Sequence, residues 1–168
     1  MSLSMYELSV PTFVRMLNSL SNILDKAMAH AKEKKLDPTE LISLRLHPDM
    51  WNLAEQVRGA CNFPIRASGR LTGTAMPNFE GKDDSFEALQ HRIAFTLKYV
   101  ESVPMAGFDG SEKKEIIFPR GDMQHKMSGQ DYLFNFALPN LYFHVTAAYA
   151  ILRQAGVPLR KEDYLGED

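Results

Sequence analysis

One apolar stripe with helical spacing dominates the first part of this sequence. Its members recur every three or four residues, which places them on one face of an α-helix and not on the alternating faces of a strand. The stripe consists of Val10, Phe13, Val14, Leu17, Leu20, Leu24, Ala27, Met28 and Ala31. It predicts a long amphipathic helix over about residues 10–34. Ser4 and Glu7 have capping-box spacing and predict a short turn before that helix.

A second helix is predicted to open at the sequence HPDMWNLAEQV. Pro48 suits the first position of a helix, and Asp49 in the first turn favours its positive end. Pro64 interrupts the backbone hydrogen bonds further on, so we expect a kink or a division there. Residues 71–84 are rich in turn formers and predict a loop.

Two more helices follow, separated by a long irregular stretch. The third covers about residues 84–102. The fourth begins near Ser128, is bent or split by Pro139, and ends before Gly156. Between them, β-favouring residues on both sides of Gly121 and Asp122 predict a small hairpin, which would have to pack against the helices to be stable.

Four long amphipathic helices without a convincing sheet predict an all-α four-helix bundle, formed by one domain over residues 1–168. The connection over residues 103–127 is longer than most connections in a compact domain. Its length indicates either a functional loop or a crossover at the end of the bundle.

Charge and cysteine content narrow the classes of protein. The net charge of −2 argues against a general nucleic-acid binder, and the apolar runs are too short to cross a membrane. The single cysteine, Cys61, excludes a disulfide within the chain and a cysteine-rich zinc site, which suits a cytoplasmic protein. Because Cys61 falls on an apolar stripe, we predict that it is a small core residue.

Common catalytic motifs are absent. The sequence has no GxxxxGK(S/T) phosphate loop, GxGxxG fingerprint, HExxH zinc motif or GxSxG nucleophile motif. None of its five histidines has a glutamate three residues before it, which excludes the di-iron sites of ferritin-like bundles.

His144 is the histidine that most invites a function. It lies on the apolar stripe of the fourth helix, where burial would lower its pKa and keep it neutral. A neutral imidazole can bind a metal or act as a base, and it can equally be a hydrogen-bonded core residue. A metal site on a helix needs a second ligand three or four residues on, and the residue at the fourth position is Ala148.

Several segments resemble one uncharacterised family of bacterial and fungal proteins, a domain of unknown function within the DinB/YfiT-like superfamily of putative metalloenzymes. They are LHPDMWNLAEQV, RLTG, SFEALQHRIAFTL, ALPNLYFHVTAAYAILRQAGVPL and the following RKEDYLG. The resemblance covers nearly the whole chain. It implies a four-helix bundle in up-down-down-up order and, commonly, a homodimer.

The resemblance also implies where a metal would bind. In metal-binding members of the superfamily, one histidine of the second helix and an HxxxH pair on the last helix hold a divalent cation. Here the first position of the pair matches His144 and the second is Ala148, while the second-helix position falls near Gln56. One of three ligands is thus retained, and we predict a degenerate site with no intact zinc, nickel or manganese centre.

Polar and aromatic residues of the second and fourth helices could line a cleft around this position. The candidates are His144, Gln56, Asn140, His47, Trp51 and Tyr142. The amide of Asn140, one turn before His144, is predicted to satisfy the imidazole. A buried hydrogen-bond network that fixes the helix register is favoured over a catalytic role. Trp51 with Phe63 and Pro64 predicts an exposed apolar patch, a candidate homodimer surface.

Three functions stay open. The first is a cytoplasmic bundle of uncharacterised activity that binds a small molecule in the cleft. The second is a metal-dependent enzyme resembling the thiol transferases and isomerases of the superfamily. The third is a structural or partner-binding dimer without a ligand.

Overall fold

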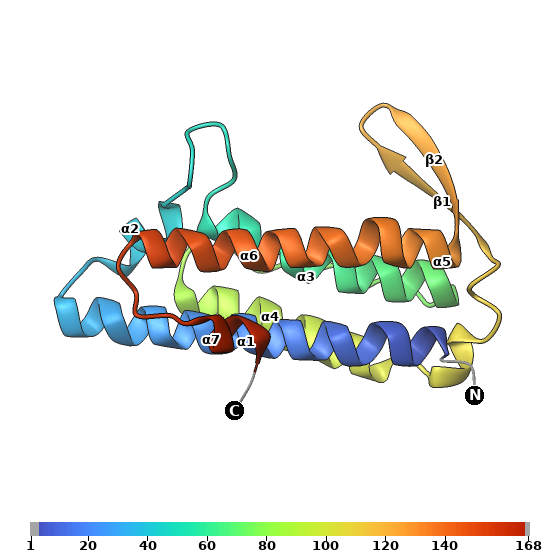
Figure 1. The fold of residues 1–168 in the computed structure, drawn as a ribbon, viewed down its shortest axis with the longest axis horizontal. Helices are drawn as coiled ribbons and strands as arrows, with labels where there is room; N and C mark the ends of the chain where they lie inside the picture. The colour runs from blue at the N-terminus through green and yellow to red at the C-terminus, as the bar shows by residue number, and fades with distance from the viewer. Residues whose placement is uncertain (1–3, 167–168) are drawn as a thin grey trace.

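The computed structural model describes residues 4–166, so residues 1–3 and 167–168 of the predicted domain lie outside it. The described chain is mostly helical, with one small two-stranded sheet. Four long helices lie side by side (Figure 1): α1 (Met5–Lys34), α3 (Leu53–Thr72), α4 (Phe86–Ser102) and α6 (Leu138–Gln154). The short helical segments are α2 (Pro38–Ser43), η1 (Met105–Phe108), α5 (Gly129–Tyr132), η2 (Leu133–Ala137) and α7 (Lys161–Leu165). None of the helices in this part of the chain has the length and hydropathy that crossing a membrane would need.

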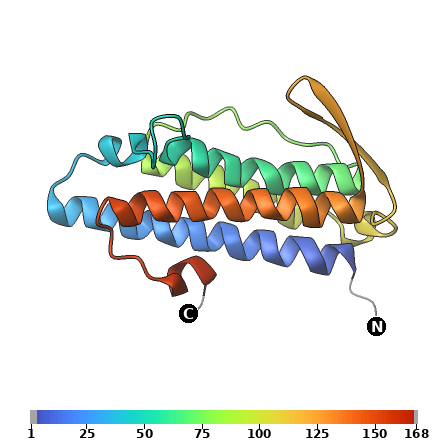
Figure 2. The ribbon, with the colours of Figure 1, turned by 45° about the horizontal axis from the view of Figure 1, so that its top comes forward.

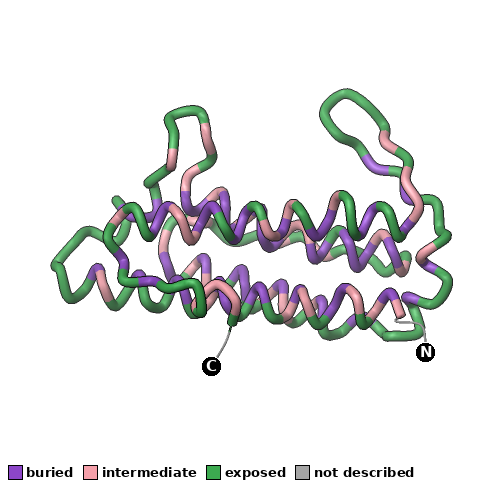
Figure 3. Tube along the Cα trace, in the orientation of Figure 1, coloured by how far each residue is buried: buried purple, intermediate pink, exposed green. Residues whose placement is uncertain are grey.

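The long helices share one core. α3 packs against α4 and α6, and α1 packs against the same two helices from the other side. α3 and α4 run opposite to α1, and α6 runs in the direction of α1 (Figures 1 and 2). Buried residues therefore line the sides on which the helices face one another (Figure 3). Residues 73–85 return along the outside of the helices to connect α3 to α4 (Figure 2).

The first two helix starts differ from the prediction. Ser4 and Glu7 form a complete capping box that begins α1 itself at Met5, so these two residues belong to the start of the long helix and not to a separate turn. α3 begins at Leu53 and not at Pro48, because Asn52 and Glu55 form a second capping box there. A capping box satisfies two backbone N–H groups that would otherwise lack partners, and this outweighs the preference of a proline for a helix start.

Two prolines lie within helical segments. Pro64 lies inside α3 without dividing it, so of the two predicted effects only a kink stays possible. Pro139 lies in the first turn of α6, directly after the π-helical segment η2, and the backbone stays helical from α5 through η2 into α6, so the predicted separation of a short helix is not seen. Ser128 caps α5 as predicted by accepting a hydrogen bond from the backbone N–H of Asp131.

The predicted hairpin is confirmed. β1 (Glu115–Arg120) and β2 (Met123–Ser128) pair antiparallel around a turn at Gly121 and Asp122. Phe118 and Ile116 are buried and attach the hairpin to the helices, whereas its tip is exposed (Figure 3). The hairpin and the loop of residues 44–52 project from the same side of the molecule, at opposite ends of α6 (Figure 1).

Candidate functional site

His144 lies at the contact between α6 and α3. Its exposure is 7%, and its Nδ1 atom is 2.8 Å from Oε1 of Gln56, which is 1% exposed. The Nε2 amide of Gln56 in turn donates to the backbone carbonyl of Trp51, at 3.3 Å. This second bond orients the amide, so that its oxygen and not its nitrogen faces the imidazole.

The tautomer of His144 follows from that orientation. An amide oxygen only accepts hydrogen bonds, so Nδ1 carries the proton and donates to Gln56. In the neutral ring, Nε2 is then unprotonated and has a free lone pair. Nε2 has no hydrogen-bond partner among residues 4–166, and it is not one of the fully buried atoms that lack a partner. Nε2 is therefore not completely shut off from solvent, although His144 as a whole is buried.

Burial also sets the charge of His144. Loss of water around the imidazolium lowers the pKa of His144 from 6.5 to about 4. The imidazole is neutral at pH 7, as the apolar stripe predicted.

Aromatic side chains surround the imidazole. The rings of Trp51 and Phe63 stack near it, with centroid distances of 5.3 and 5.5 Å, and Phe143 meets it edge-on at 5.5 Å. Trp51 is 47% exposed and Phe143 is 55% exposed. These three side chains form what we call the aromatic patch. Because all three rings lie close to the imidazole, a flat apolar group bound to the patch would also lie close to His144.

Gly59 is the residue of α3 on which the imidazole ring rests. A Cβ atom at this position would lie 2.8 Å from both Nδ1 and Cε1 of His144 and 2.9 Å from Cδ2. Three ring atoms at nearly equal distances mean that one face of the ring lies flat on the glycine. Only a glycine lets α3 and α6 approach this closely with a histidine between them.

We expect Gly59→Ala to displace the imidazole and to weaken its bond to Gln56. Overpacking costs about 1–3 kcal/mol, against about 1 kcal/mol gained from the helix propensity of alanine. The pKa of His144, measured by NMR, should rise from about 4 as the ring gains water.

The matched control repeats Gly59→Ala in a His144→Ala background. There the added methyl group meets no ring, so urea unfolding should find it neutral or stabilising. A wild-type pKa in the single variant would contradict the close contact.

Comparison with known families supplies the identity. The family profile described as "Domain of unknown function (DUF1993)" matches residues 5–165. The chain belongs to the DUF1993 family. It is also similar to a solved structure of a DinB family member protein from Shewanella denitrificans, with 39% sequence identity and a TM-score of 0.89 over 97% of this chain and 92% of that one. No protein with a curated description matches it. The resemblance seen in the sequence is thereby confirmed.

The donors of this DUF1993 protein do not fit the three-histidine site that the resemblance implies. Ala148 is fully buried and offers only a methyl group, and the oxygen of Gln56 already accepts a hydrogen bond from His144. A single imidazole with a neutral amide is a weak donor set for a divalent transition metal. Across residues 4–166 no group of three histidine, cysteine, aspartate or glutamate side chains is placed to hold a metal.

The other candidate residues form no hydrogen bond with His144 in the described chain. The amide of Asn140 donates to the carbonyl of Phe136 at 2.7 Å, so Gln56, and not Asn140, is the partner of the imidazole. His47 is exposed and contacts Asp49. Burial raises the pKa of Tyr142, which lies within electrostatic reach of Arg15 in α1. The structure thus brings together only three of the six candidates, His144, Gln56 and Trp51.

Two further predictions concern the second helix. Cys61 is buried, and the loss of water raises the pKa of its thiol to about 12, which confirms a core cysteine. Pro64 is also buried, so it does not contribute to an exposed patch. The exposed aromatic residue beside Trp51 is instead Phe143 of α6. The sequence did not single out Phe143, because no motif or helical pattern marks it.

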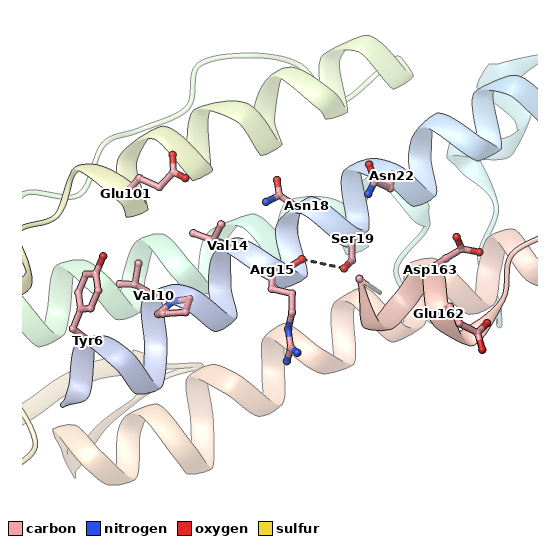
Figure 4. Close-up of a pocket in the computed structure, with 12 residues that line it drawn as sticks. Tyr6, Val10, Val14, Arg15, Asn18, Ser19, Asn22, Glu101, Glu162 and Asp163 are labelled. Carbon is pink, nitrogen blue, oxygen red and sulfur yellow. Dashed lines mark hydrogen bonds between the residues drawn. The ribbon is translucent and has the colours of Figure 1, made fainter. Parts of the chain in front are cut away.

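A cavity of about 610 Å³ lies on the outer side of α1, away from His144 (Figure 4). Val10 and Val14 of α1 lie beside it, with Arg15, Glu101 of α4 and Glu162 of α7 around its rim. Its charged groups have mixed sign and do not converge on one point in Figure 4. Its charged residues come from three separate helices, so no local sequence pattern predicts that they lie together.

Proposed function

We propose that this DUF1993 protein is a four-helix bundle of the DinB/YfiT-like type, formed by a single domain. The chain directions of α1, α3, α4 and α6 support the up-down-down-up order, with the loop of residues 73–85 as the link between the two parallel helices. The similarity to the DinB family member protein supports the same assignment. A buried free cysteine agrees with a cytoplasmic location.

Within this bundle, we propose that His144 and Gln56 form the base of a binding site for a small molecule, without a metal. The observation that carries the proposal is the accessible, unprotonated Nε2 of His144 beside the aromatic patch. Such an arrangement suits a ligand that has a flat apolar ring and one hydrogen-bond donor. The hydrogen bond between Gln56 and His144 also holds α3 and α6 in register, so the same bond orients the binding site and stabilises the fold.

Two alternatives are less well supported. A thiol transferase of the superfamily type would need a metal, and the side chains around His144 are poor metal donors. This alternative would be favoured if the dialysed protein kept stoichiometric zinc, nickel or manganese and the His144→Ala variant did not. A homodimer without a ligand is favoured only by the exposure of Trp51 and Phe143. Sedimentation of Trp51→Ser would show whether the aromatic patch holds two copies together.

The proposed function predicts a donor-dependent thermal shift. Phenol at millimolar concentration should raise the melting temperature, because a ligand of the native state stabilises it, whereas anisole, which lacks the donor, should not. His144→Gln should abolish the difference between the two compounds. His91→Gln, which changes an exposed histidine of α4, is the matched control and should retain it. Equal shifts with phenol and anisole, or a phenol shift that survives in His144→Gln, would exclude the site.

A further inference from the structure

A second cavity lies on the other half of α3 and is rich in arginine. Asn62, Arg66 and Arg70 follow one another at intervals of four residues, which places them on one face of the helix. Arg92 of α4 and residues 76–79 of the loop between the helices complete a cavity of about 250 Å³. We call it the arginine pocket.

Two of its three guanidinium groups are held in place by aromatic rings. Arg70 donates to the hydroxyl of Tyr132 at 2.9 Å and lies over the ring of Phe118, 5.1 Å from its centroid. Arg92 lies 4.2 Å from the centroid of Phe79 and forms a bidentate pair with Asp83, at 2.6 and 3.0 Å. Fixed guanidinium groups lose little conformational entropy when they bind a ligand.

The pocket has an excess of positive charge. The arginines that form ion pairs in the described chain are Arg58 and Arg92, and both contact Asp83. Arg66 and Arg70 have no carboxylate partner within residues 4–166, although the whole protein has a net charge of −2. Burial raises the pKa of Tyr132, and the positive charges of Arg70 and Arg66 both oppose that rise, so both guanidinium groups lie near this phenol.

Two neutral amides supply further hydrogen-bond donors. The side chains of Asn62 and Asn78 line the pocket and have no hydrogen-bond partner among the residues that the structure describes. Ile65, Met76 and Pro77 form apolar walls beside them. The pocket thus combines free donors for an anion with a surface for a small organic group.

We propose that the arginine pocket binds a phosphate group, either free or on a small organic molecule. A guanidinium fork matches the geometry of phosphate oxygens, and the volume admits such a group together with one small ring. His144 does not line this pocket, so the proposal is independent of the site proposed above.

The test is a calorimetric titration with inorganic phosphate and with phenyl phosphate, at constant ionic strength set by chloride. Saturable binding of at least one probe is expected in the millimolar range or tighter. Arg66→Gln should weaken that binding about tenfold or more, since a charge-assisted hydrogen bond to the phosphate is lost. Arg66 is exposed and has no hydrogen-bond partner in the described chain, so the variant should fold normally.

Arg15→Gln is the matched control, because it removes the same charge from an exposed site on α1. Its affinity for the probes should equal that of the wild type. Tighter binding of phenyl phosphate identifies an organic phosphate as the ligand class, and equal affinities identify free phosphate. Absence of saturable binding of both probes, or equal losses in Arg66→Gln and Arg15→Gln, overturns the proposal.

Discussion

Replacing Asp83 with alanine is expected to destabilise the protein by about 3–5 kcal/mol. The side chain of Arg92 is only 9% exposed, and the Asp83 carboxylate that neutralises it is 11% exposed. Without Asp83, the guanidinium keeps its contact with the Phe79 ring but is left as an uncompensated charge in a largely dry environment. Removing one partner of a buried pair costs far more than the pair itself contributes.

Urea unfolding of three variants isolates that effect. Asp84→Ala removes the same charge from the adjacent, exposed position and should change the free energy of unfolding by less than about 0.5 kcal/mol. Asp83→Ala combined with Arg92→Met should recover most of the lost stability, because no buried charge remains. A loss in Asp83→Ala as small as in Asp84→Ala would mean that water screens the pair as on an open surface.

The arginine pocket shows what the sequence could not predict. Arg92 falls on a helix whose apolar stripe was evident, but the residues that hold it, Phe79 and Asp83, come from a loop whose path no local pattern specifies. Arg70 likewise depends on Phe118 and Tyr132, which are distant in sequence. Such contacts depend on tertiary structure, and periodicity reports only which face of a helix is buried.

Local rules predicted most helices but competed at their ends. The stripes of α1 and α4 and the turn of the hairpin followed from spacing alone. The start of α3 was misplaced because Pro48 and the capping box that begins at Asn52 lie close together in the sequence, and both are helix-start signals. Asn140 was assigned to His144 by helical spacing, yet a carbonyl of the π-helical segment one turn earlier takes its amide.

The two proposed sites are joined by a row of aromatic side chains. Phe63 stacks near His144 and meets Phe136 edge-on at 5.7 Å, and Phe136 packs against Phe118 at 4.6 Å. Phe118 in turn lies under the guanidinium of Arg70. Through Phe118, the hairpin therefore supports the arginine pocket directly. It supports the His144 site through Phe136, which contacts Phe63 of the aromatic patch.

Acid is expected to destabilise the protein through His144. The folded pKa of about 4 lies below the unfolded value near 6.5, because burial favours the neutral ring. The unfolded chain therefore binds the proton first. The stabilisation is fully present above pH 6.5 and is lost as the pH falls towards 4. At about 1.4 kcal/mol per pH unit, the loss reaches about 3 kcal/mol by pH 4.

Comparison with His144→Gln separates this loss from the titration of carboxylates, which both proteins share. The free energy of unfolding, measured by urea between pH 7 and 4, should fall more steeply in the wild type, and the difference between the two curves should grow throughout that window. His91→Gln should follow the wild-type curve, since it leaves the buried imidazole in place. A wild-type curve parallel to that of His144→Gln would mean that His144 is hydrated in the folded state, and the accessible lone pair would then belong to an ordinary surface histidine.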